Sequence, residues 1–356
     1  RQRQMCIRDR NRKDEHVSLA KAFHNKQKNE FDTVRIVHNA LPQLAVSEVS
    51  LHTSVAGLDL HYPFYINAMT GGSEKTKKIN RELATIAKET DLMIATGSVS
   101  AALKDPTLAE TYQVMRDVYP NGKILANVGA GTSVVKAKQA IELFEADALQ
   151  IHLNAPQELV MPEGDRDFSN WKELIQAIRE EISVPLIVKE VGFGMTRETI
   201  DELAALGVKT IDISGRSGTS FTQIENARRP KRELNYLADW GQSTVTSLLE
   251  ANEAKYPVEV LASGGIRNAF DIFKALCLGA QAVGISGTVL NSLMSNGVED
   301  TIQLLKDWQD ELRLLFTMVG AETIDQLHHH PVILTGATKD WCEARGISLT
   351  KYGNRK

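Results

Sequence analysis

The most constraining feature of the sequence is a short apolar segment followed by an amphipathic segment, a pair that occurs eight times between residues 64 and 320. Short apolar runs predict strands, and apolar residues at a period of 3.6 predict helices. Strands that alternate with helices form parallel sheets, and eight consecutive units favour a closed (β/α)₈ TIM barrel over an open doubly wound sheet. The strands are expected at Phe64–Met69, Leu92–Thr96, Ile124–Val128, Ala148–Leu153, Pro185–Glu190, Lys209–Ser214, Val258–Ala262 and Gln281–Ile285.

The amphipathic segments give the helices and two irregular features of the barrel. Helices are expected at Lys75–Thr90, Thr107–Val118, Ser133–Glu145, Ser169–Glu181, Arg197–Leu206, Gln242–Ala254, Asn268–Leu278 and Glu299–Met318. An insert of about 27 residues, Ser217–Ser243, follows the sixth strand, and a loop of that length is usually functional or a lid. Before the first strand, alternating runs at Val46–Leu51 and Thr53–Val55 with a turn at Gly57 predict a hairpin that plugs one barrel end.

Composition limits the classes of function. The chain has 356 residues, 42% of them hydrophobic, and a net charge of −4, which fits a large core and gives no sign of a nucleic-acid or membrane partner. No apolar run approaches the ~20 residues that span a bilayer, and three widely spaced cysteines fit a reducing cytoplasm. We expect one domain over residues 11–356 with a barrel core at about 64–320, and a homo-oligomer; residues 1–10, RQRQMCIRDR, are interpreted as a sequence artefact.

Two glycine-rich turns follow the last two expected strands. Ser263-Gly264-Gly265 comes directly after one strand, and Ser286-Gly287 comes after the next. Residues without a Cβ atom let backbone N–H groups approach an anion closely, and barrels of this kind bind phosphate after their seventh and eighth strands. We therefore expect a phosphate site at these turns, although one such turn alone would also fit an ordinary strand–helix connection.

The fourth expected strand carries the clearest candidate site. Its side chains alternate in direction, so that Gln150 and His152 point to the opposite face from their apolar neighbours. His152, Asn154, Gln157 and Glu158 cluster at the carboxyl end of this strand, where the active site of a barrel lies. A single histidine in a barrel strand is most often a core residue, but the cluster favours a functional site.

Other charged residues allow more than one interpretation. Lys189 lies near the end of the fifth strand, and its burial would be costly unless an anion or an electron-rich ligand lies opposite it. An ion pair with Glu190 is not expected, because neighbours on a strand point to opposite faces. Glu225 and Arg228 in the insert have the spacing either of a shared helix face toward the barrel mouth or of a surface ion pair. The histidines at 328–330 lack the spacing for one metal and predict a solvated loop, and the charged run at 11–16 reads by composition as a solvated helix start.

These motifs together resemble the type 2 isopentenyl diphosphate isomerases, which are FMN-dependent (β/α)₈ barrels. The resemblance covers nearly the whole chain from residue 11, and the set of motifs is highly specific, whereas SGGIR and ISG alone would indicate only a nucleotide-phosphate barrel. Phe221 stands where members often have Trp, which leaves an aromatic wall in place. The motifs are NRKDEH at 11–16, NAMTGG at 67–72, ATGS at 95–98, ANVGA at 126–130, HLNAPQE at 152–158, VKEVGFG at 188–194, SGRSGTSF at 214–221, IENAR at 224–228, SGGIR at 263–267 and ISG at 285–287.

The resemblance implies a role for each matched residue. FMN phosphate would be held by Gly264, Gly265, Ser286 and Gly287, and the flavin would be lined by Ala68, Met69, Thr70, Ser98, Asn127, Ser214 and Thr219. Lys189 would face the N1/O2 edge of the flavin, and Glu158 would ligate Mg²⁺. Arg12 and Lys13 would clamp the substrate diphosphate, and Gln157, Glu225 and Arg228 would also bind substrate. His152, Asn154 and Gln157 would surround the prenyl end, and with Lys189 they are the expected catalytic residues.

The implied activity is the conversion of isopentenyl diphosphate to dimethylallyl diphosphate, with reduced FMN exchanging the protons and NAD(P)H serving to reduce the flavin beforehand. No side-chain acid–base pair is evident in the sequence, which agrees with this role for FMN. The alternative is an FMN-dependent 2-hydroxy-acid oxidase, which needs a catalytic histidine near strand six, where this chain reads DISGRSGTSF. A non-catalytic flavin-binding barrel would leave the polar strand ends without a purpose.

Overall fold

The computed structural model describes residues 14–19 and 29–355, and its centre is a closed barrel of eight parallel strands. Each strand pairs with the next along the chain, and β11 pairs with β4 to close the barrel, with Val283 opposite Phe64. The predicted (β/α)₈ barrel is therefore confirmed, and every strand overlaps its expected segment. The strands are β4 (Phe64–Ile66), β5 (Ile94–Ala95), β6 (Ile124–Gly129), β7 (Ala148–His152), β8 (Leu186–Lys189), β9 (Thr210–Asp212), β10 (Glu259–Ser263) and β11 (Ala282–Ile285).

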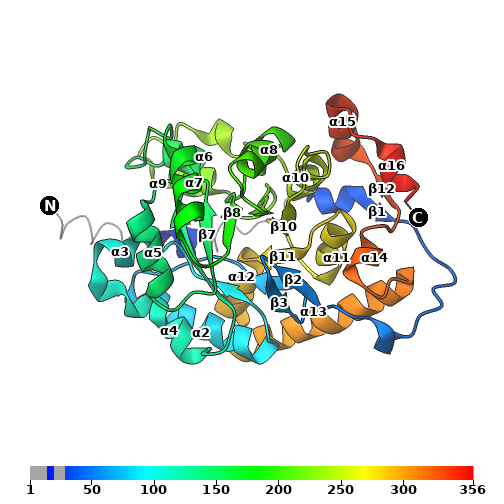
Figure 1. The fold of residues 1–356 in the computed structure, drawn as a ribbon, viewed down its shortest axis with the longest axis horizontal. Helices are drawn as coiled ribbons and strands as arrows, with labels where there is room; N and C mark the ends of the chain where they lie inside the picture. Colours follow the sequence, from blue (N-terminus) through cyan, green and yellow to red (C-terminus); the bar gives the residue numbers. More distant parts are fainter. Residues whose placement is uncertain (1–13, 20–28, 356) are drawn as a thin grey trace.

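Helices surround the strands (Figure 1). The predicted helix at 107–118 is split into a 3₁₀ turn and an α-helix, and the helices predicted at 133–145 and 242–254 are shorter. The eighth unit has two helices that meet at Gly297, where the sequence predicted one. The helices of the barrel are α2 (Glu74–Thr90), α3 (Ser100–Lys104), η3 (Pro106–Leu108), α4 (Glu110–Val118), α5 (Val134–Glu142), α6 (Ala155–Val160), α7 (Trp171–Glu181), α8 (Arg197–Ala205), α9 (Phe221–Arg228), η4 (Asn235–Leu237), α10 (Thr244–Ala251), α11 (Ala269–Cys277), α12 (Gly287–Asn296) and α13 (Val298–Val319).

A hairpin closes the amino-terminal end of the barrel, as predicted, but it uses fewer residues. Its strands are β2 (Thr53–Val55) and β3 (Leu58–Leu60), whereas part of the run at 46–51 forms the 3₁₀ helix η2 (Val46–Glu48). Val55 and Leu60 pack into one buried cluster with the barrel residues Leu125 and Ile187. The barrel is thus plugged at this end, and a ligand can enter only from the other one.

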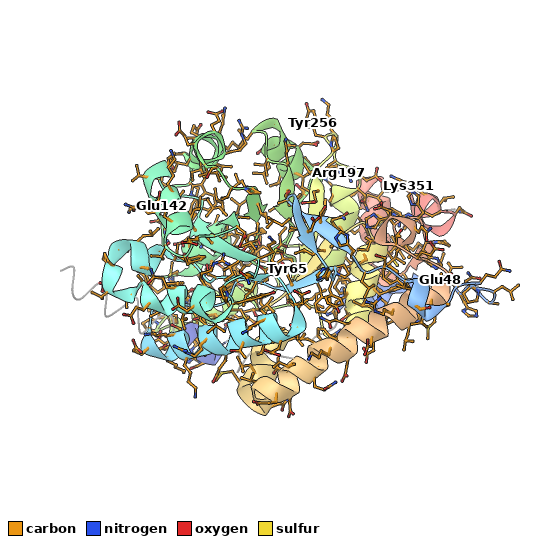
Figure 2. All side chains as sticks on the ribbon, turned by 60° about the horizontal axis from the view of Figure 1, so that its bottom comes forward. Glu48, Tyr65, Glu142, Arg197, Tyr256 and Lys351 are labelled. Atoms are coloured by element: carbon orange, nitrogen blue, oxygen red, sulfur yellow. The ribbon has the colours of Figure 1, made fainter. Side chains whose placement is uncertain are left out.

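The core has two layers. The inner cluster fills the barrel, and a larger cluster lies between the strands and the helices. Tyr65, which belongs to the inner cluster, lies near the centre of the molecule, whereas Glu142, Tyr256 and Lys351 lie at its periphery (Figure 2). Within the described part of the chain, no helix has the length and apolar character needed to cross a membrane.

Elements before and after the barrel meet at one side of it (Figure 1). β1 (Val34–Ile36) pairs antiparallel with β12 (Val332–Leu334), next to η1 (Glu30–Thr33), α14 (Ile324–Leu327), α15 (Gly336–Arg345) and α16 (Leu349–Gly353). The prediction of a solvated loop at the histidine run is wrong for two of its residues. His328 donates to the main-chain oxygen of Ala280 at 3.0 Å and His330 to that of Val37 at 2.8 Å, and both rings are half-buried.

Candidate active site

One cavity opens at the carboxyl ends of the barrel strands. Its volume is about 1260 Å³, and residues that follow each of the eight strands line it. Sites for one drug-sized ligand usually have about 300–1,000 Å³. The cavity therefore has room for a nucleotide-sized cofactor and a second small molecule.

The two glycine-rich turns lie side by side on one wall of the cavity, because β10 and β11 are neighbours. Gly264 and Gly265 have φ of +96° and +77°, and a Cβ atom on Gly264 would lie 2.1 Å from the main-chain oxygen of Gly215. Only glycine fits there. In the neighbouring turn, Ser286 directly precedes α12, and its side chain does not cap that helix. Backbone N–H groups at such a helix start, beside a glycine turn, form a phosphate cradle.

The residues expected around a flavin line this same cavity, next to the cradle. Thr70 is 2% exposed, and its Oγ1 has no hydrogen-bond partner among the described residues. A buried hydroxyl of this kind needs a polar partner, and a ligand in the cavity can supply one. The glycine cradle and the hydroxyl of Thr70 fit a flavin mononucleotide. The expected flavin-lining residues found in the wall are Ala68, Met69, Thr70, Ser98, Asn127, Lys189, Ser214 and Thr219.

Lys189, the last residue of β8, brings a buried cation to the cavity wall. Its side chain is 6% exposed, and Nζ donates a 2.5 Å hydrogen bond to the main-chain oxygen of Glu190, not to its carboxylate. Burial lowers the pKa of Lys189, and the charges of Asp212 and Glu190 oppose that shift. An anionic ligand beside Nζ would stabilise the charged form further.

Glu190 is a site residue that the sequence did not reveal. Its Oε2 accepts hydrogen bonds from the main-chain N–H groups of Val191, Gly192 and Phe193 at 2.6, 2.9 and 2.6 Å. Burial raises the pKa of Glu190 to about 8, although these N–H groups and Lys189 act in the other direction. The carboxylate fixes the turn after β8, and Val191 and Gly192 of that turn line the cavity.

The cluster after β7 lies across the barrel from the glycine turn after β11, and next to Lys189 on β8. α6 begins directly after this strand, and His152, Asn154, Gln157 and Glu158 all line the cavity. Glu158 accepts from Nδ2 of Asn154 at 2.8 Å and from the main-chain N–H of Asp165 at 3.0 Å, one bond at each carboxylate oxygen. Each oxygen keeps a second lone pair, so the carboxylate can ligate Mg²⁺ together with substrate phosphates.

Glu225 and Arg228 of α9 lie behind the cavity wall. Their side chains, 0% and 16% exposed, form an ion pair with an N–O distance of 2.6 Å, which is a buried pair where the sequence left a surface pair or a mouth-facing helix open. Glu225 also accepts from Nε2 of Gln157 at 2.9 Å, so it reaches the cavity through that side chain. Burial raises the pKa of Glu225, but bonds from His16, Gln157 and Arg228 outweigh it and hold the pKa at about 2.

The helix at 14–19 lies across the barrel mouth. Asp14 accepts from the hydroxyl of Ser73 at 2.7 Å on one side, and Nε2 of His16 lies 2.9 Å from Glu225 on the other. His16 and Val17 line the cavity. His16 is thus a further site residue, which the charged run had hidden. The predicted diphosphate clamp, Arg12 and Lys13, lies outside the described residues, as do residues 1–10.

Comparison with known proteins adds sequence relatives that match almost the whole chain. An FMN-dependent dehydrogenase family model matches residues 135–334. An isopentenyl-diphosphate delta-isomerase of Streptomyces sp. (strain CL190) is 50% identical, with 97% of this chain and 95% of that protein covered. Proteins of the same name from Latilactobacillus sakei and Listeria innocua are each 48% identical and cover 95% and 98% of this chain, at 97% and 98% of their own lengths.

Solved structures with the same fold are more distant in sequence. A mandelate oxidase variant with an FMN adduct has a TM-score of 0.63 at 18% identity, with 90% of this chain and 92% of that one covered. A flavocytochrome b2 variant with benzoylformate has a TM-score of 0.65 at 17% identity, with 90% and 82% covered. At such identities the likeness shows the fold alone.

Proposed function

This chain belongs to the isopentenyl-diphosphate delta-isomerases, within the FMN-dependent dehydrogenase family, and we propose on that basis that it converts isopentenyl diphosphate to dimethylallyl diphosphate. The reaction adds a proton to the terminal alkene carbon and removes another from the methylene on the far side of the double bond. Protons balance and no electrons are transferred. The bound and reduced flavin supplies the acid–base chemistry that an unactivated alkene needs.

One observation carries the proposal: the glycine turns, the residues expected around a flavin and the cluster after β7 all line a single cavity. The glycine turns would hold the FMN phosphate, and Lys189 would hold negative charge at one edge of the ring. His152, Asn154 and Gln157 would surround the prenyl chain between the flavin and α6. Gln157 is itself held by Glu225, so its amide is directed by a buried carboxylate.

The diphosphate end of the substrate would be bound by a metal and by cations. Glu158 would ligate Mg²⁺, a hard cation that is commonly held by one or two carboxylates together with substrate phosphates. Among the described residues no three His, Cys, Asp or Glu side chains gather into a metal site. Arg12 and Lys13 would close over the diphosphate, directly ahead of the helix that crosses the mouth.

Three further parts of the proposal concern the protein in its cell. NAD(P)H would reduce the flavin and would not be consumed in each turnover. The enzyme would be cytoplasmic, which the two described cysteines support because both are free thiols buried in the core. It would act as a homo-oligomer, with residues 11–356 as its single domain.

The rival activity is that of a 2-hydroxy-acid oxidase, whose fold the solved structures share. Such an enzyme needs a histidine base near the sixth strand, and the segment from Asp212 to Phe221 has none. The relatives of about half identity bear the isomerase name, which favours the main proposal.

An anaerobic isomerase assay tests the proposal. The protein is incubated with isopentenyl diphosphate, and FMN, reductant and Mg²⁺ are each omitted in turn. We expect dimethylallyl diphosphate to form only when all three are present, with no net consumption of reductant after the flavin is reduced. Oxidation of a 2-hydroxy acid with matching flavin reduction, and no isomerisation, would contradict it.

A further inference from the structure

A chain of polar side chains crosses the barrel interior beneath the cavity. It begins at Asp212 on β9, passes Asn67 after β4, and continues through Gln150 on β7 and Asn127 on β6 to His152. β4 is not a sheet neighbour of β7 or of β9, so the two contacts of Asn67 cross the interior, whereas those of Asn127 join the neighbouring strands β6 and β7. Asp212, Gln150 and Asn67 are 0–2% exposed, and none of these groups is a surface residue.

Each link in the chain is a hydrogen bond. Nδ2 of Asn67 donates to Oδ2 of Asp212 at 2.8 Å, and Nε2 of Gln150 donates to Oδ1 of Asn67 at 3.3 Å. Nδ2 of Asn127 donates to Oε1 of Gln150 at 3.1 Å. Oδ1 of Asn127 then lies 2.7 Å from Nδ1 of His152. The path therefore contains three amides in series between a carboxylate and an imidazole.

The carboxylate sets the direction of every bond in this path. Ionised Asp212 can only accept, and it accepts also from Ser263 Oγ at 2.7 Å, the N–H of Ser214 at 3.1 Å and Tyr65 OH at 3.2 Å. Asn67 must therefore turn its NH₂ group toward Asp212 and its oxygen toward Gln150. Its oxygen is held in that orientation by the N–H of Ala68 at 2.8 Å.

The side-chain amides of Gln150 and Asn127 are oriented by the same rule. An amide that accepts on one side donates on the other, so Gln150 and Asn127 both turn in the same direction as Asn67. An oxygen, that of Asn127, is then presented to His152, and the ring must donate from Nδ1. We propose that Asp212 is a positioning residue that fixes His152 as the Nδ1–H tautomer across the barrel, so that Nε2 is the basic nitrogen of the neutral ring.

This assignment has a functional consequence. His152 lines the cavity, whereas Asp212, Gln150 and Tyr65 do not, so they act on the ring only through the amides. In the Nδ1–H tautomer, Nε2 can accept a hydrogen bond or a proton from a ligand, and in the other tautomer it would donate. The role of that nitrogen in turnover rests on the proposed isomerase function, but the tautomer itself does not.

Asp212 also acts on a second site residue, which the test must separate. It pairs in register with Lys189, and its charge raises the pKa of that lysine. A change at Asp212 alone could therefore alter the cavity through Lys189. Gln150 is the better position for a cut, because it lies in the middle of the chain and pairs with Ile187, not with Lys189, on the neighbouring strand.

The experiment is ¹⁵N NMR of the full chain labelled at histidine, with and without FMN, at a pH where the rings are neutral. The chain has nine histidines, and loss of one signal set in His152→Gln assigns the ring. We expect wild-type His152 to be protonated at Nδ1. In Asp212→Asn the constraint from the carboxylate is lost, but the N–H of Ala68 still holds the oxygen of Asn67, so we expect part of the ring population to shift to Nε2–H. In Gln150→Met, which cuts the chain, we expect a larger share of that form.

Tyr65→Phe is the matched control, because it removes one donor to Asp212 and leaves the chain from Asp212 to His152 intact; its tautomer should be that of the wild type. Tyr65 lies near the centre of the molecule (Figure 2), so this variant also reports the effect of a change in the deep core. A wild-type ring protonated at Nε2 would overturn the inference, even if no variant folds. Unchanged tautomers in Asp212→Asn and Gln150→Met, or a switch in Tyr65→Phe, would also overturn it.

The outcome is independent of the isomerase assay. A switched tautomer in an enzyme that does not isomerise would remove the proposed function and keep this inference. Isomerisation without a change of tautomer in the variants would support the proposed function and overturn this inference.

Discussion

Lys189 shows how a single residue can be tuned for a ligand. Its side chain is buried, and burial lowers its pKa, while the charges of Asp212 and Glu190 act in the opposite direction. A cation in this position stabilises negative charge on a bound ring more than it stabilises a distant diphosphate. We expect Lys189→Ala to lower the reduction potential of bound FMN, by about 30 mV for each 1.4 kcal/mol of lost interaction.

Spectroelectrochemistry of the FMN-loaded variant checks this prediction, with Lys189→Arg as a control that keeps the charge. Turnover should fall more than substrate affinity in Lys189→Ala. If the potential stayed at the wild-type value and only the substrate KM changed, Lys189 would belong to the diphosphate site.

Glu158 is the second residue whose role can be separated by a small change. A neutral amide is a much poorer ligand than a carboxylate for a hard cation. We expect Glu158→Gln to remove most Mg²⁺-dependent activity and to leave FMN binding unchanged, because Glu158 is not one of the residues expected to hold the flavin. Activity titrated against Mg²⁺ measures this, together with the absorbance of bound flavin. Wild-type Mg²⁺ dependence in the variant would assign the metal to another group.

At the scale of elements, a buried carboxylate joins the carboxy-terminal helix α15 to the barrel. Glu250 on α10 is 0% exposed, and it accepts from Nε of Arg197 and of Arg345 at 2.8 Å each and from Trp341 Nε1 at 2.9 Å. Burial raises the pKa of Glu250, but the bonds from Arg345, Arg197 and Trp341 outweigh burial and lower it to about 2. The junction therefore stabilises the fold while this group is ionised.

We expect Glu250→Gln to lower the free energy of unfolding by about 1–3 kcal/mol at pH 7, the range for hydrogen bonds to charged groups. Since the folded pKa lies below the unfolded value of about 4.3, the difference should be complete above that pH and vanish as pH falls toward 2. Urea unfolding of both proteins at several pH values measures it. Glu181→Gln is the control, because Glu181 and its partner Lys138 are both exposed and solvent screens such a pair. Equal effects of the two changes would contradict a special role of the junction.

The regular elements are also those that the sequence predicts well. Ile124–Val128 is short and largely apolar, Ala148–Leu153 alternates apolar and polar side chains, and both form strands of the barrel. The carboxy-terminal strand β12 is different, because it pairs with β1, about 300 residues away in the chain, and no local pattern encodes such a partner. The alternation at 46–51 predicts a strand, but part of this run forms a 3₁₀ helix, because so short a pattern does not distinguish the two structures.

The candidate site likewise contains residues that the sequence predicts and residues that it does not. Strand-end residues such as Asn127 and His152 could be found from alternation, since a barrel brings all strand ends to one face. The partner of Gln157 could not be found this way, because Glu225 comes from the insert and makes contact only after the insert folds over the cavity. His16 was hidden among charged residues for the same reason, since its contact with Glu225 spans most of the chain.

On the scale of the whole molecule, the amino-terminal segment is the part that joins the two sides of the mouth. The helix at 14–19 bonds to Ser73 at the start of α2 and to Glu225 on α9, and Glu15 pairs with Arg228 at 3.2 Å. These contacts place residue 14 at the rim of the cavity. Arg12 and Lys13, which are the predicted diphosphate clamp, directly precede this residue in the chain.

The clamp is tested by comparing two changes at this end of the chain. A diphosphate carries several negative charges, and each Arg or Lys contact in a closed mouth contributes about 1.5–3 kcal/mol as a charged hydrogen bond. We expect Arg12→Ala/Lys13→Ala to lower kcat/KM by on the order of a hundredfold or more under saturating FMN and Mg²⁺. Deletion of residues 1–10 is the control and should leave kcat/KM unchanged. Near-normal kcat/KM in the double variant would show that Arg12 and Lys13 do not clamp the diphosphate. These two residues would then belong to a solvated helix start, and the contacts of Asp14 and His16 would serve the fold and not the substrate.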